Sequence, residues 1–224
     1  MSTPTYILGI SCHYHDSGAA LLRDGQVIFA AQEERYTRTK QDDEFPMNAI
    51  EHALTFAGIT AQELNAVVFY EKPLLKFFDR ILPTLMKVWP KGFMQYHMAM
   101  HDWMQKKLWV RQEIEQKVNT ECPVLFAGHH ESHAASSFYC SPFEKAAIVT
   151  VDGVGEWATT TIGIGEGTQM KLLKEIHYPH SLGLLYSALT YYLGFRVNSA
   201  EYKVMGLAPY GEPKYMNKFH QMVE

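Results

Sequence analysis

Short apolar runs alternate with turn signals at the start of the chain. Residues 6–11 (YILGIS), 19–22 (AALL) and 27–31 (VIFAA) are rich in strand-forming side chains, and Asp24-Gly25 lies between the last two runs. An Asp-Gly dipeptide between two apolar runs is typical of a tight hairpin turn. The pattern therefore predicts that the chain opens with a three-stranded meander.

The following segments predict helices and strands in mixed order. Apolar side chains recur at helical spacing over residues 47–59, so we expect a helix there. Residues 66–70 and 124–127 are short apolar runs that predict single strands. Helix and strand together indicate an α/β fold, a mixed sheet with helices packed against it.

Residues 74–118 differ from the rest of the chain. They are rich in Met, Trp and Phe and are interrupted only by Pro83, Pro90 and Gly92. We expect two or three helices inserted into the fold. Two roles fit their apolar side chains: packing in the core or in a homodimer contact, because aromatic stripes are mostly buried, and a binding groove lined by adaptable methionines.

The second half of the chain predicts another small sheet followed by helices. Residues 145–151 (KAAIVTV) and 158–164 (ATTTIGI) read as the two strands of a hairpin, and residues 172–177 continue the sheet. Apolar side chains then recur at helical spacing over residues 181–194 and 213–223.

Composition limits the classes of function. The 224 residues, 47% hydrophobic and 20% charged, are typical of a soluble protein with one large or two small domains. A net charge of −4 provides no long-range attraction for nucleic acid or an anionic membrane. No apolar run approaches the ~20 residues of a membrane helix, and the N-terminus lacks the basic region of a signal peptide. The three cysteines show no CxxC spacing. We therefore expect a cytoplasmic protein that binds neither membrane nor nucleic acid.

Three histidines gather in residues 128–137 (GHHESHAASS). If a helix begins near Gly128, His129 and His133 project from one face with Cβ atoms about 5–6 Å apart, so both imidazoles reach one metal ion. The segment does not match the His-Glu-x-x-His pattern of zinc proteases. Taken alone, such a pair is also typical of a surface position or of histidines whose hydrogen bonds are satisfied in the core.

The segment 152–156 (DGVGE) directly follows the predicted strand 145–151, where open α/β sheets place their ligands. A carboxylate at a strand end reaches a cation, while the glycines allow backbone amides to approach an anion. A tight hairpin turn is an alternative explanation of the same residues. Two imidazoles with Asp152 suit Fe(II), Mn(II) or Zn(II), and they fit Fe(II) particularly well when open positions remain.

Two further polar segments carry candidate chemistry. Residues 13–18 (HYHDSG) follow the first predicted strand, where main-chain amides commonly cradle a phosphate and a histidine serves as general base near neutral pH. A polar turn with a capping Asp explains that segment equally well. Residues 198–208 (NSAEYKVMGLA) place a lysine before a Gly-containing apolar turn, which fits either a phosphate or acceptor contact or a structural loop.

Four segments in order resemble one family. Together these segments are similar to the O-carbamoyltransferases of the nodulation-protein and antibiotic-tailoring type. The similarity extends from about residue 6 to 215. The similar segments are residues 7–40 (ILGISCHYHDSGAALLRDG, then AAQEERYTRTK), 128–139 (GHHESHAASSFY), 151–160 (VDGVGEWATT) and 181–211 (from SLGLLY to GFRVNSAEYKVMGLAPYG). Such proteins resemble tRNA threonylcarbamoyl-transfer proteins in their N-terminal part.

The resemblance implies an actin/hexokinase-like ATPase fold built from two ribonuclease-H-like halves. It places the first subdomain over residues 1–144, including the helical insertion 74–118, and the start of a second over residues 145–224. Members of the family are more than twice as long, and they carry a further metal-binding aspartate in the second half and a separate adenylate-forming domain. We therefore expect a fragment or a natural short form with an incomplete site.

The activity implied by the resemblance is ATP-dependent O-carbamoylation. One domain converts carbamoyl phosphate and ATP into carbamoyl-adenylate, and the N-terminal domain passes the carbamoyl group to a hydroxyl of a small-molecule acceptor. The alternatives are a threonylcarbamoyl-type transferase acting on tRNA, which the acidic net charge disfavours, and a non-catalytic nucleotide-binding fragment.

The resemblance also assigns individual residues. The metal ligands of the family fall on His129, His133 and Asp152, and the family's metal is iron. The turn beside the nucleotide phosphate falls on Gly153 and Gly155, and we extend it to Val154 and Glu156. The histidine that acts in the transfer step falls on His15. His13 and His130 receive no role.

Overall fold

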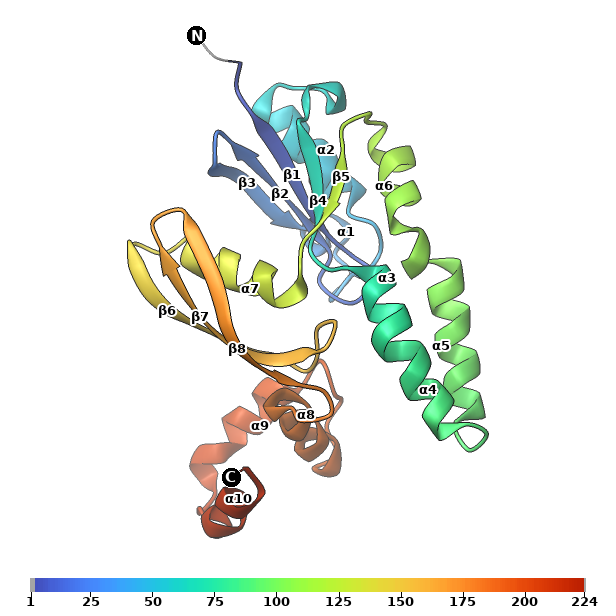
Figure 1. Cartoon of the computed structure of the whole chain (residues 1–224), viewed down its shortest axis with the longest axis vertical. Coiled ribbons are helices and arrows are strands. Elements are labelled where there is room, and N and C mark those ends of the chain that lie inside the picture. Colours follow the sequence, from blue (N-terminus) through green and yellow to red (C-terminus); the bar gives the residue numbers. More distant parts are fainter. Residues whose placement is uncertain (1–2, 224) are drawn as a thin grey trace.

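The computed structural model describes residues 3–223, whose strands form two separate sheets (Figure 1). The first sheet has the order β3-β2-β1-β4-β5, with the bounds Tyr6–Ser11 (β1), Gly18–Arg23 (β2), Gln26–Gln32 (β3), Ala66–Phe69 (β4) and Val124–Phe126 (β5). The second sheet has the order β6-β7-β8, with the bounds Lys145–Val151 (β6), Ala158–Glu166 (β7) and Gln169–His177 (β8). The predicted α/β class is confirmed.

The predicted meander is present in the first sheet. β1, β2 and β3 pair antiparallel in succession, whereas β4 and β5 run parallel to β1. Asp24 and Gly25 join β2 to β3 with φ angles of 52° and 82°, the left-handed backbone that a two-residue hairpin turn requires. This strand order and mixture of directions is the ribonuclease-H-like arrangement that the resemblance implied.

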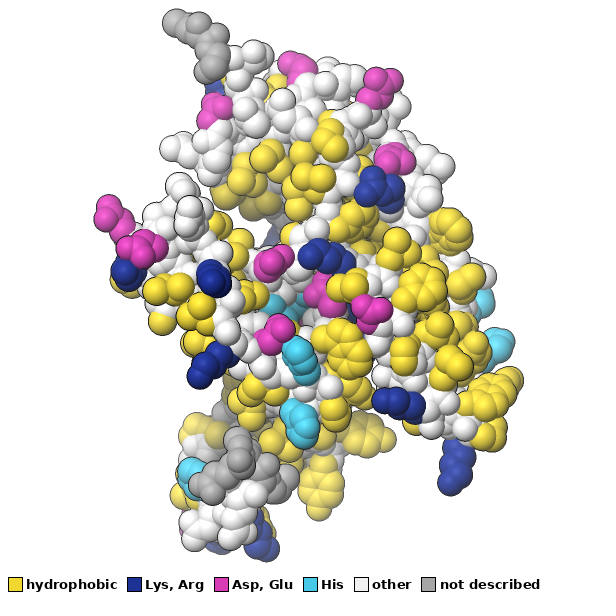
Figure 2. Space-filling model, in the orientation of Figure 1, with side chains coloured by type: hydrophobic (Ala, Val, Ile, Leu, Met, Phe, Trp, Pro, Cys, Tyr) yellow, Lys and Arg dark blue, Asp and Glu magenta, His cyan; other side chains and the backbone are white. Residues whose placement is uncertain are grey.

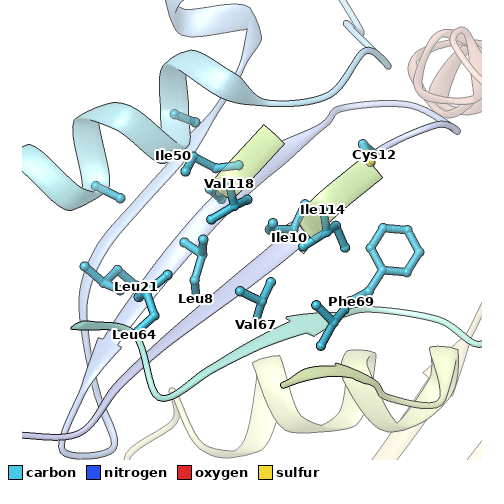
Figure 3. Packing of buried hydrophobic residues seen from close by; sticks show 14 of the residues in the cluster. Leu8, Ile10, Cys12, Leu21, Ile50, Leu64, Val67, Phe69, Ile114 and Val118 are labelled. Atoms are coloured by element: carbon cyan, nitrogen blue, oxygen red, sulfur yellow. The ribbon is translucent and has the colours of Figure 1, made fainter. Parts of the chain in front are cut away.

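One face of the first sheet carries the main core (Figure 3). Buried and half-buried side chains alternate along β1, so Leu8 and Ile10 point to the same face. Helices α2 (Met47–Ala57) and α6 (Val110–Val118) contribute buried apolar side chains to the same cluster. Fully burying an aliphatic side chain such as Leu8 contributes roughly 1.5–3 kcal/mol.

Helix α7 (His129–Phe138) lies between the two sheets (Figure 1). Its Ala134 and Phe138 pack against Ile148 of the second sheet. A hollow lined by apolar side chains separates α7 from the face of the first sheet opposite the core, and Figure 2 shows an opening between the two sheets. The helix therefore connects the two halves of the fold and places its N-terminus at their junction.

The segment 74–118 forms a helical arm, as predicted. Its elements are α3 (Pro73–Leu75), the π-helical η2 (Lys76–Ile81), α4 (Leu82–Val88), α5 (Phe93–Gln105), the 3-10 turn η3 (Lys107–Trp109) and α6. Helices α4 and α5 run side by side and are joined through Pro90 and Gly92 (Figure 1). Trp103 is buried against Phe77, with ring centroids 5.4 Å apart. The arm also exposes apolar side chains such as Met98, and Figure 2 shows hydrophobic side chains gathered over it.

Three helices follow the second sheet: α8 (Leu182–Tyr192), α9 (Glu201–Leu207) and α10 (Met216–Val223). α8 and α10 lie within the predicted helices, and α9 occupies most of the segment 198–208. The short elements α1 (Glu34–Thr37), η1 (Ala61–Glu63) and η4 (Ala208–Tyr210) had no predicted counterpart, because three or four residues display no periodicity. Within residues 3–223, no helix combines the length and apolar character needed to cross a bilayer.

Candidate metal centre

The predicted histidine pair lies at the N-terminus of α7, just after β5. The helix begins at His129, directly after Gly128, so His129 and His133 are one turn apart on the same face. Their Nε2 atoms are 3.1 Å apart. The local geometry that the spacing predicted is present.

Two carboxylates fix the start of this helix. Glu131 Oε2 accepts a hydrogen bond from Gly128 N at 3.0 Å, and both carboxylate oxygens of Glu156 accept from His129 N, at 3.1 and 3.2 Å. The first amides of a helix lack partners within the helix and carry partial positive charge, so carboxylates there are stabilising. Glu156 also accepts from Lys72 N at 2.9 Å. Its carboxylate therefore holds protein amides together at the junction of three segments.

Asp152 directly follows β6 and completes the group of donor atoms. Its Oδ2 is 2.7 Å from His129 Nε2 and 3.6 Å from His133 Nε2. We call His129, His133 and Asp152 the metal-ligand cluster, because one donor atom from each lies within 4.8 Å of the others. The side chains of His133 and Asp152 are 51% and 35% exposed, whereas that of His129 is 10% exposed. The cluster is open on one side, and two imidazoles with one carboxylate fit a divalent transition metal.

The cluster is strongly coupled electrostatically. Hydrogen bonds from His129 and His133 hold the pKa of Asp152 well below its usual range. Burial lowers the pKa of His129, but its hydrogen bond to Asp152 and the nearby negative charge of Glu71 outweigh burial and raise this pKa to about 9. At neutral pH a protonated His129 therefore faces an ionised Asp152. A divalent ion held by these side chains would take over the role of that proton, since metal binding releases protons from ligands.

Glu71 belongs to this site and was missed by sequence reasoning. It directly follows the predicted strand 66–70 and is buried, with Oε2 2.5 Å from Lys76 Nζ and 3.5 Å from His129 Nδ1. The longer distance is that of an ion pair rather than of a strong hydrogen bond. A carboxylate beside the second nitrogen of a metal-binding histidine orients the ring. The available signal was an acid directly after an apolar strand, the position that Asp152 also occupies.

His130 connects α7 to the second sheet. Its Nε2 donates to the carbonyl of Ala158 at 2.8 Å, so its Nδ1 accepts from Thr150 Oγ1 at 2.6 Å. Burial lowers the pKa of His130 and keeps the ring neutral. Because both ring nitrogens are engaged, His130 has a structural role and no free lone pair for a metal.

The turn after β6 packs closely against α7. A Cβ atom on Gly155 would lie 3.0 Å from His129 Cβ and 3.0 Å from His130 Cδ2. These contacts are tighter than ordinary van der Waals contacts, so a side chain at residue 155 would push the turn and the histidines apart by a few tenths of an ångström. The turn thereby sets the distance between Asp152 and the helix that carries its partners.

The amides of the same turn donate within the protein. Gly153 N donates to Asp152 Oδ1 at 2.6 Å, and Gly155 N donates to a backbone carbonyl of β7 at 2.9 Å. The first of these bonds orients the carboxylate of the cluster. The contact of residues 153–156 with a nucleotide phosphate stays a prediction.

His15 lies on a different segment, the loop between β1 and β2. Its Nδ1 is 2.8 Å from Asp16 Oδ2, and its side chain is 49% exposed. Within residues 3–223, no hydrogen bond or ion pair joins His15 to the metal-ligand cluster. Its neighbour His13 is buried and pairs with Glu113 of α6 at 2.6 Å. The structure brings the three predicted metal ligands together and leaves the predicted base on a separate exposed loop.

Comparison with known proteins shows what the chain resembles. It is 52% identical over 221 residues to the uncharacterized protein sll1178 of Synechocystis sp., a match that covers 95% of this chain and 36% of that protein. It is 37% identical over 214 residues to the nodulation protein NolNO of Sinorhizobium fredii, covering 94% of this chain and 30% of NolNO. The chain thus spans about a third of the length of these relatives.

Among solved structures, YeaZ from Pseudomonas aeruginosa is similar with a TM-score of 0.39 and 14% sequence identity, over 78% of this chain and 68% of that chain. A family model described as the carbamoyltransferase N-terminus matches residues 6–224. The chain therefore belongs to the carbamoyltransferase family and corresponds to the N-terminal region of its members.

Proposed function

We propose that this chain carries the transfer site of an ATP-dependent O-carbamoyltransferase. The site would move a carbamoyl group from carbamoyl-adenylate, made from carbamoyl phosphate and ATP, to a hydroxyl of a small-molecule acceptor. Family membership supports the reaction class. The observation that carries the proposal is the convergence of His129, His133 and Asp152, from two elements, within 4.8 Å of one another.

The metal-ligand cluster would hold a divalent ion through both Nε2 atoms and Asp152 Oδ2. Such an ion supplies Lewis-acid stabilisation of negative charge on a phosphate oxygen. Two imidazoles and one carboxylate favour Fe(II) where open positions remain, with Mn(II) and Zn(II) as alternatives. Glu71 and Asp152, on opposite sides of the His129 ring, would fix its orientation.

His15 is the proposed general base. Its Nδ1 forms a hydrogen bond with Asp16, so a proton on Nδ1 leaves Nε2 as an acceptor. Asp16 would orient the imidazole ring, as a third group does for other activated bases. The acceptor oxygen would attack the carbamoyl carbon and form a new C–O bond as the bond from that carbon to the adenylate oxygen breaks. The hydroxyl proton would pass to His15 Nε2, and AMP would leave with the bonding electrons.

Replacing His15 with Ala should lower the rate of carbamoyl transfer by about 10²–10⁴-fold with little change in KM, because a base acts in the chemical step. The measurement is release of AMP from supplied carbamoyl-adenylate in the presence of a panel of sugar alcohols. His97→Ala, which removes an exposed histidine of the helical arm, is the matched control and should transfer at the wild-type rate. Near-normal transfer by His15→Ala would remove this residue from the mechanism.

A further inference from the structure

A cavity of about 220 Å³ lies beside the metal-ligand cluster, between the loop after β1 and the helical arm. The side chains that matter in its wall are Tyr14, Glu71, Lys76, Arg80, Trp103 and Val154. Glu71 also faces His129, and Val154 lies in the turn that follows Asp152. The cavity therefore adjoins the candidate transfer site without including its metal ligands.

Arg80 is the side chain in this wall whose charge is unmatched. It is 7% exposed, and its Nε is buried without a hydrogen-bond partner. The two lysines of the wall have carboxylate partners. Lys76 pairs with Glu71 at 2.5 Å, and Lys107 pairs with Asp102 at 2.7 Å. By contrast, no ion pair within residues 3–223 includes Arg80.

A buried, unpaired guanidinium is costly and rare in folded proteins. Burial lowers the pKa of Arg80, and the nearby charge of Glu71 offsets only part of this effect. Glu71 is already shared between Lys76 and His129, so it does not neutralise a third cation. The free hydrogen-bonding capacity of Arg80 indicates a partner from outside the chain.

We propose that this cavity binds an oxyanion, a carboxylate or phosphate group carried by the acceptor, with Arg80 as its principal contact. The assignment to the acceptor rests on the proposed transfer function. A guanidinium donates two parallel N–H bonds to either group, a geometry that a lysine does not offer. At ~30 Å³ per water, the cavity holds the volume of about seven waters, enough for one oxyanion and the atoms attached to it. The rest of the acceptor would extend past Val154 toward the cluster.

Arg80→Met in the full chain tests the proposal, with inorganic phosphate as the probe. Metal is first removed on a chelating resin, so that phosphate binding at the cluster does not contribute. We expect calorimetry to show phosphate binding about 10- to 100-fold weaker than in the wild type. The Tm of the unliganded variant should equal or exceed that of the wild type, because an apolar side chain replaces an unpaired buried charge. Arg111→Met, which removes an exposed arginine of α6, should bind phosphate like the wild type.

Equal phosphate affinity in Arg80→Met and the wild type would overturn the proposal, as would the absence of phosphate binding by the wild type. Comparing glucose, glucuronate and glucose 6-phosphate separates an acceptor-borne group from a free ion. If either charged sugar binds more tightly than both glucose and inorganic phosphate, the result supports an oxyanion carried by the acceptor. If inorganic phosphate binds most tightly, the result contradicts that assignment. The phosphate titrations use metal-free protein and require no turnover, so failure of the metal or the transfer proposal would leave their result unchanged.

Discussion

Asp152→Asn should weaken binding of a divalent metal by more than roughly 100-fold. Loss of a group that only orients a metal ligand already weakens binding by up to about 100-fold, and Asp152 is proposed as a ligand itself. The substitution keeps the size of the side chain but removes its negative charge, leaving two neutral imidazoles as the protein's contribution to the cluster. The hydrogen bonds that hold the pKa of Asp152 low keep this carboxylate ionised at working pH, so the charge lost is a full one. Competition with a chromogenic chelator measures the affinity.

Asp24→Asn is the matched control for that experiment. It makes the same chemical change at an exposed turn between β2 and β3, where Asn tolerates the positive φ of 52°. Its metal affinity should equal that of the wild type. An Asp152→Asn affinity within threefold of the wild-type value would show that the carboxylate is not a ligand.

Gly183→Ala should destabilise the chain by about 1–3 kcal/mol and weaken metal binding, although Gly183 is not a ligand. A Cβ atom at this position would lie 2.7 Å from Gly153 N and closer still to the Asp152 carbonyl. Both neighbours are backbone, so the added atom forces α8 or the turn to move. Ser181 Oγ donates to the Gly153 carbonyl at 2.7 Å and ties the start of α8 to the same turn.

Chemical denaturation measures this change in the free energy of unfolding. The control is Gly206→Ala, which lies in α9 with no atom within 4 Å of the added Cβ. That substitution should be neutral or stabilise the chain by up to about 1 kcal/mol, because Ala favours helix over Gly. Wild-type stability and metal affinity in Gly183→Ala would contradict the role of the close α8 contact in positioning Asp152.

Features encoded by neighbouring residues could be predicted from the sequence. The Asp24-Gly25 turn and its flanking runs specified the meander, and the four-residue spacing of His129 and His133 specified a shared helix face. Asp152 was placed near them by its position directly after a strand, together with the family resemblance. Each of these inferences needs only local geometry or one strand end.

Features that depend on which strands become neighbours could not be predicted. Glu71 approaches His129 because β4 and β5 pair in parallel, which brings the residues after both strands to one edge of the sheet. Arg80 lines the same region because the helical turns that follow β4 and the loop after β1, which are distant in the sequence, form the walls of one cavity. Likewise, Glu156 caps α7 through a contact between distant segments that its place in a glycine-rich turn did not reveal.

Elemental analysis of anaerobically purified protein tests the metal-ligand cluster most directly. The wild-type chain and the His97→Ala control should each retain about one equivalent of a divalent transition metal. His129→Ala should retain almost none, because it removes the least exposed of the three ligands, the one that faces both Asp152 and Glu71. Equal metal content in His129→Ala and the wild type would contradict the assignment of this cluster as the metal centre.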